Sequence, residues 1–91
     1  MADVRYVVTF DVPEGPIGPY DAEDGLARLR RTTGVQGVTL YESREGHPDY
    51  LLEVQVDPGS VESVRQTLEQ LMGEYSTYLS NVTRRQFRVL A

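Results

Sequence analysis

Residues 49–57, DYLLEVQVD, present two different sides at a spacing of two residues, the period of a β-strand. The apolar side consists of Tyr50, Leu52, Val54 and Val56. The mixed side consists of Leu51, Glu53 and Gln55. The apolar side predicts a strand that packs under helices. The mixed side predicts a surface that is neither plain solvent-facing surface nor dry core.

Other parts of the chain show either this period of two residues or the spacing of three and four residues that is typical of a helix. Alternation predicts further strands at residues 4–10, 35–44 and 82–90. A first helix is expected after Asp21 and ends at Gly34, and a second carries apolar residues at spacings of three and four from Val61 to Leu79. Between the first strand and the first helix, residues 11–20 hold three of the five prolines and predict a stiff loop.

The resulting order of elements is βαββαβ. Two βαβ-type crossovers that feed one antiparallel sheet place both helices on the same side of it. We therefore predict an α+β, ferredoxin-like fold with a four-stranded sheet in the spatial order 4-1-3-2. A chain of 91 residues accommodates one core, so a single domain is expected over residues 1–91.

The helix-free side of the sheet, here called the bare face, collects one side chain in two from each strand. The residues expected there are Val7, Thr9, Thr39, Tyr41, Ser43, Leu51, Glu53, Gln55, Arg84, Gln86 and Arg88. On the last strand, Phe87 and Val89 are expected to turn inward. An unpaired charge is costly to bury, so Glu53 should meet an arginine, water or a ligand.

Composition excludes several kinds of chemistry. The chain has no Cys and no Lys, since all nine basic residues are Arg, and it has one His. Disulfides, thiolate chemistry and Schiff bases are thereby excluded, and we expect no metal and no cofactor. The net charge of -5 disfavours nucleic acid as a partner. No apolar run is long enough for a membrane span and no signal peptide is recognisable, so the cytoplasm is expected.

The single imidazole, His47, lies in a Gly-His-Pro turn between two predicted strands. We expect it to be a solvent-exposed turn residue, away from the bare face, rather than a metal ligand or a general base.

The sequence also resembles a known superfamily. The residues that carry the resemblance are Gly34-Val35, Gly37-Val38, Gly46, Asp49-Tyr50-Leu51-Leu52, Val54, Val56, Ser60, Val64 and Leu68. They are similar to the stand-alone effector-binding domain of Lrp/AsnC-type regulators and to EthD-like and antibiotic-biosynthesis-monooxygenase-like proteins of the dimeric α/β barrel superfamily. The resemblance implies a homodimer whose sheets pack through their bare faces around a ligand or active site. A helix-turn-helix segment and the histidine of many EthD-like proteins have no counterpart here.

Three functions follow as hypotheses. The first is a homodimer that binds a small organic ligand, of the amino-acid or aromatic-acid class, between the sheets and under the 11–20 loop. Its predicted ligand-binding residues are Thr9, Tyr41, Glu53, Gln55, Gln86 and Arg88. The second is a cofactor-independent monooxygenase, isomerase or cyclase for an aromatic or polyketide-like substrate, with Glu53 as base and Arg88 or Tyr41 stabilising an oxyanion. The third is an assembly module without a cavity.

Overall fold

The computed structural model describes residues 4–13 and 19–91, with the backbone alone at residues 19–22. The elements are β1 (Val4–Asp11), α1 (Pro19–Arg30), β2 (Val35–Glu42), β3 (Tyr50–Val56), the short 3-10 turn η1 (Pro58–Ser60), α2 (Val61–Glu74) and β4 (Ser80–Arg88). The predicted order βαββαβ is confirmed.

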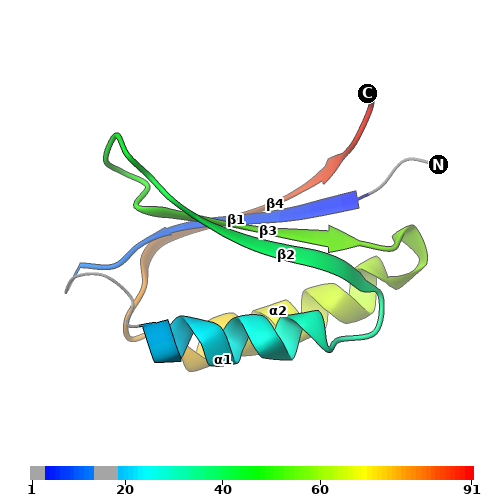
Figure 1. Cartoon of the computed structure of the whole chain (residues 1–91), viewed down its shortest axis with the longest axis horizontal. Helices are drawn as coiled ribbons and strands as arrows, with labels where there is room; N and C mark the ends of the chain where they lie inside the picture. The colour runs from blue at the N-terminus through cyan, green and yellow to red at the C-terminus, as the bar shows by residue number, and fades with distance from the viewer. Residues whose placement is uncertain (1–3, 14–18) are drawn as a thin grey trace.

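The four strands form one antiparallel sheet in the order β2-β3-β1-β4, which is the predicted order read from the other edge. Both helices lie on the same side of this sheet, and no described element covers the other side (Figure 1). The ferredoxin-like fold and its bare face are therefore confirmed.

The core lies between the sheet and the helices. Its buried residues are Tyr6, Val8, Phe10, Leu29, Val38, Leu52, Val54, Val56, Val64, Leu68, Leu71 and Met72. The apolar side of β3 is the side under the helices, as its alternation predicts. Along α2 the buried positions recur at spacings of three and four, so the helix packs along one stripe.

Helix α2 is shorter than predicted. It ends at Glu74, whereas the apolar spacing continues to Leu79. The backbone N–H of Tyr75 donates to Leu71 O at 3.3 Å, and that of Ser76 to Gly73 O at 3.3 Å. The helix thus closes one residue after Gly73, whose backbone freedom makes it a poor helix former. Neither described helix is long and apolar enough to cross a membrane.

The turn between α1 and β2 depends on Gly34. Its φ of +92° lies in the left-handed region, and its carbonyl accepts the Asp57 N–H at 2.8 Å. A Cβ placed here would lie 2.2 Å from the Cβ of Ser60. The glycine therefore permits both the turn and its close approach to the β3–α2 connection.

We predict that Gly34→Ala lowers the free energy of unfolding by at least about 2 kcal/mol, because it combines an unfavourable φ with a steric clash. Gly73→Ala is the matched control. A Cβ there meets no atom within 4 Å, so it should stabilise the helix by about 0.5–1 kcal/mol. Urea denaturation of both variants tests this, and equal effects would contradict it.

Candidate functional site

Three rows of side chains cross the bare face from β2 to β4, because residues that pair directly in an antiparallel sheet share a face. The first row is Tyr41, Leu51, Thr9 and Thr83. The second is Thr39, Glu53, Val7 and Arg85. The third is Gly37, Gln55, Arg5 and Phe87. Of the predicted site residues, the bare face thus brings together Thr9, Tyr41, Glu53 and Gln55.

The bare face mixes apolar and polar groups as the sequence predicts. Tyr41 and Phe87, at opposite edges, are 48% and 49% exposed, which is high for large hydrophobic side chains. Leu51 and Val7 are partly buried between them. The hydroxyl groups of Thr9 and Thr83 are hydrogen-bonded to each other across β1 and β4. A face of this kind is suited to contact with another surface.

The predicted placement of Gln86 and Arg88 is wrong. Both residues lie on the helix side of β4, because Gln86 pairs with Tyr6 and Arg88 pairs with Val4. Arg84 lies on that side as well, and its Nε is 3.1 Å from Oε1 of Glu69 on α2. Gln86 and Arg88 therefore do not share a surface with Thr9 and Glu53.

The error comes from placing Phe87 in the core. The β4 edge strand instead turns Phe87 to the bare face, together with Arg85 and Thr83, and covers its helix side with long polar side chains. On that side Arg84 forms an ion pair with Glu69 of α2, and both side chains are partly exposed. Apolar character at Phe87 therefore marks the bare face rather than the core.

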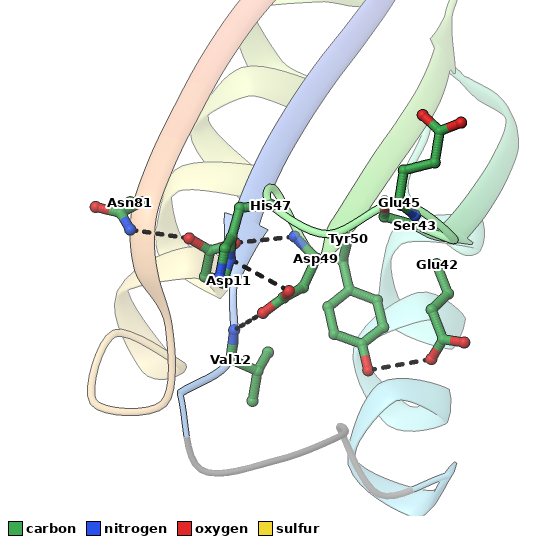
Figure 2. Close-up of polar contacts among 9 residues, drawn as sticks. All are labelled: Asp11, Val12, Glu42, Ser43, Glu45, His47, Asp49, Tyr50 and Asn81. Atoms are coloured by element: carbon green, nitrogen blue, oxygen red, sulfur yellow. Dashed lines mark hydrogen bonds and ion pairs between the residues drawn. The ribbon is translucent and has the colours of Figure 1, made fainter.

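A second group of polar residues gathers where β1 ends. Asp11, the last residue of β1, is only 6% exposed. Its Oδ2 accepts Asn81 Nδ2 at 2.8 Å, and its Oδ1 accepts the Asp49 N–H at 2.9 Å (Figure 2). The Nδ1 of His47 lies 3.0 Å from the same Oδ1. Three neighbours thus satisfy a carboxylate that would be costly to bury alone.

Asp49 completes this group, which we call the Asp11 cluster: Asp11, His47, Asp49 and Asn81. The Oδ2 of Asp49 accepts the Val12 N–H at 3.2 Å, and its Oδ1 is 3.3 Å from His47 Nδ1. The cluster joins the end of β1, the β2–β3 turn, the residue before β3 and the beginning of β4. It therefore ties three strands together at one end of the sheet.

The cluster shifts the pKa values of Asp11 and His47. Hydrogen bonds from Asn81, His47 and the Asp49 backbone lower the pKa of Asp11 from 3.8 to about 2, against the opposing effect of burial. The hydrogen bond to Asp11 and the negative charges of Asp11 and Asp49 raise the pKa of His47 above 6.5. Ionised Asp11 and protonated His47 therefore stabilise each other.

The geometry also determines which nitrogen of His47 is free to react. An ionised carboxylate only accepts hydrogen bonds, so Nδ1 carries the proton and Nε2 is left unprotonated in the neutral ring. The side chain of His47 is 79% exposed, so Nε2 is accessible. A carboxylate that orients an imidazole in this way is the arrangement of a general acid–base dyad.

Asp11, His47 and Asp49 also have the composition of a cation site. One ligand atom from each lies within 4.8 Å of the others. The Nδ1 of His47 lies at hydrogen-bonding or ion-pair distance from both carboxylates. The group is therefore built as a hydrogen-bonded dyad.

The exposure predicted for His47 is confirmed, but its contact with Asp11 is not found by sequence reasoning. Asp11 and His47 are 36 residues apart, and no local spacing joins them. Asp11 is two residues beyond Thr9, and the pairing of β1 with β4 shifts in register between these two residues. His47 therefore lies at the end of β1, next to the bare-face row that contains Thr9. The predicted roof over this face falls largely on residues 14–18, outside the described residues.

Comparison with known proteins agrees on the fold. A dimeric ferredoxin-like protein of unknown function from Thermobifida fusca superposes with a TM-score of 0.71 at 12% identity, over 97% of this chain and 92% of that one. A putative antibiotic biosynthesis monooxygenase from Bordetella bronchiseptica superposes with a TM-score of 0.70 at 19% identity, over the whole of both chains. A dabb family protein with a ferredoxin-like fold from Mesorhizobium loti superposes with a TM-score of 0.69 at 10% identity, also over the whole of both chains.

No family model matches the chain, and no curated protein matches its sequence. The solved structures show that the chain has the ferredoxin-like fold. At these identities, the similarity is one of fold.

We predict that Asp11→Asn destabilises the protein most between about pH 4 and 6.5, where Asp11 is ionised and His47 protonated. The contribution of Asp11 is present above its unfolded pKa of 3.8 and is lost as the pH falls through about 2. The contribution of His47 is full below 6.5 and is lost as the pH rises through its raised pKa.

Urea denaturation from about pH 2 to about pH 9, beyond both ends of this window, measures the effect. Asp24→Asn is the control, because Asp24 is an exposed aspartate on α1. If the free energies of unfolding of the wild type and of Asp11→Asn differ by the same amount at all these pH values, the cluster does not act through charge.

Proposed function

We propose that the protein is a homodimer that binds a small organic ligand between two bare faces. The observation that carries this proposal is the mixed character of the bare face, where Tyr41 and Phe87 are half exposed beside Glu53 and Arg85. A face that mixes exposed aromatic groups with charged ones is best satisfied by a second copy with water or ligand between the sheets. Structures with this fold include proteins described as dimeric.

Charge complementarity suggests how the two copies meet. In the middle row, Glu53 and Arg85 lie on either side of Val7. A two-fold axis that runs along β1 near Val7 sets Glu53 opposite the partner subunit's Arg85, and the reverse. A two-fold axis across the strands would set like charges opposite each other, which is unfavourable. We propose the first arrangement.

The ligand is proposed to contact Thr9, Tyr41, Glu53 and Gln55. Tyr41 and Thr9 belong to the first row, Glu53 to the second and Gln55 to the third, so their polar groups share one face. They offer hydroxyl, amide and carboxylate groups among apolar side chains, which is the usual composition of a small-molecule site. Amino acids and small aromatic acids are the proposed ligand class.

A cofactor-independent enzyme is the second candidate, and a different observation favours it. Arg88 lies on the helix side and cannot assist Glu53 on the bare face. The Asp11 cluster supplies instead an imidazole held by a buried carboxylate at the end of the bare face. This group is a better acid–base candidate than Glu53, because its orientation is fixed by a hydrogen bond.

We predict that Glu53→Arg weakens the dimer by about tenfold or more, because it places like charges opposite each other, and that Glu53→Arg with Arg85→Glu restores it. Glu62→Arg, on the exposed surface of α2, is the control and should not change the dimer. Sedimentation velocity measures the dissociation constants. A wild-type protein that stays monomeric at high concentration would overturn the proposal.

A ligand is sought by thermal shift and by NMR with amino acids and small aromatic acids. We expect at least one compound to raise the melting temperature and to shift the signals of Thr9, Tyr41 and Glu53 more than those of helix residues. If no compound shifts the NMR signals of the bare face in a protein shown to be dimeric, the ligand site is contradicted and the dimer is not.

A further inference from the structure

We propose that His47 and Asp11 form a proton-transfer site for a neutral organic molecule with an acidic C–H beside a carbonyl group. This deepens the enzyme candidate and rests on the proposed function in one respect: the substrate reaches His47 Nε2 from the bare face. It replaces Glu53 with His47 as the group that accepts the proton.

The first support is the burial of Asp11. The carboxylate is 6% exposed and has hydrogen bonds from Asn81, Asp49 and His47. A surface ion pair is usually mobile and weak. Here one partner is fixed by neighbours from the β2–β3 connection and from β4. The imidazole ring that it holds therefore has a defined position and a defined tautomer.

The second support is the contrast between the two ring nitrogens. Nδ1 is 3.0 Å from Asp11 Oδ1 and 3.3 Å from Asp49 Oδ1. Among the described residues no hydrogen bond to Nε2 is found, and the side chain is 79% exposed. The protein thus fixes one nitrogen and leaves the other available, which a purely structural clamp does not require.

The third support is the charge of the surroundings. Asp11 from β1 and Asp49 from the β3 end are the charged groups that contact His47, and Asn81 from β4 is neutral. With His47 protonated, these groups keep one negative charge. An anionic substrate would be repelled, whereas a neutral carbonyl compound would not. The charge therefore defines the substrate class.

The proposed reaction needs no cofactor. A C–H bond next to a carbonyl group breaks, its proton passes to Nε2 of neutral His47, and its electron pair forms the enolate. The imidazolium is stabilised by Asp11 and returns a proton to the same carbon or to the oxygen. Return to the oxygen gives the enol, so the net change is a tautomerisation.

Acetylacetone is a suitable probe, because exchange of its C3 hydrogens for deuterium in D₂O is followed by NMR. We expect the protein to accelerate this exchange by about tenfold or more over His47→Gln, which is below the ~100-fold often contributed by a positioned base. Glu45→Gln, in the same turn but without a contact to the His47 ring, should equal the wild type. The exchange rate should rise with pH as His47 loses its proton.

Two further readouts separate this role from a structural one. Asp49→Asn should keep the exchange but move its pH midpoint downward, because one of the two charges that raise the pKa of His47 is removed. Nitrogen NMR should show neutral His47 with its proton on Nδ1. Equal exchange in the wild type and His47→Gln, a proton on Nε2, or loss of exchange on adding EDTA would each overturn the proposal.

The proposal and the dimer fail separately. The mass of each variant in solution shows whether the dimer forms, and circular dichroism shows whether His47→Gln is folded. A folded, dimeric His47→Gln without exchange supports the proton-transfer site. A monomeric wild type that still shows exchange dependent on His47 would contradict the dimer alone.

Discussion

Both crossovers of this chain carry their helices to the same side of a four-stranded sheet, and the rest of the molecule follows from that constraint. The helices bury every second side chain of the central strands. They leave the alternate side chains of all four strands without cover. Two of the large exposed hydrophobic residues, Tyr41 and Phe87, lie on this uncovered side.

The Asp11 cluster is the second organising feature, and it lies where the uncovered side ends. Because β1 is central in the sheet, a buried carboxylate at its last residue can reach both a neighbouring hairpin and the first residues of β4. The same hydrogen bonds that attach the hairpin also orient the only imidazole of the chain. One set of contacts thus attaches the hairpin and orients the imidazole that we propose as the acid–base group.

Much of the fold could be predicted from the sequence, because alternation and helical spacing are local. The order of elements, the order of strands and the two sides of β3 followed from these periods. The end of α2 did not, since the apolar spacing continues through a turn that closes after Gly73. The orientation of β4 did not either, because Phe87 suits the core and the bare face equally well and only its pairing with Arg5 decides.

The site was harder to predict, because its central contact joins residues that are distant in the sequence. Thr9 and Glu53 could be placed from alternation within their strands. The contact of His47 with Asp11 joins distant parts of the chain, and it depends on how the hairpin folds back on β1. No spacing in the sequence indicates such a contact. It therefore becomes visible only when the strands are assembled.

The central claim is that the bare face is covered by a second copy. Isotope-filtered NMR on a mixture of labelled and unlabelled chains tests it most directly, because only contacts between copies are then observed. The account predicts intermolecular Overhauser effects that involve the methyl groups of Val7 and Leu51 and the ring of Phe87. Their absence, with a solution mass that stays at 10.3 kDa, would contradict it.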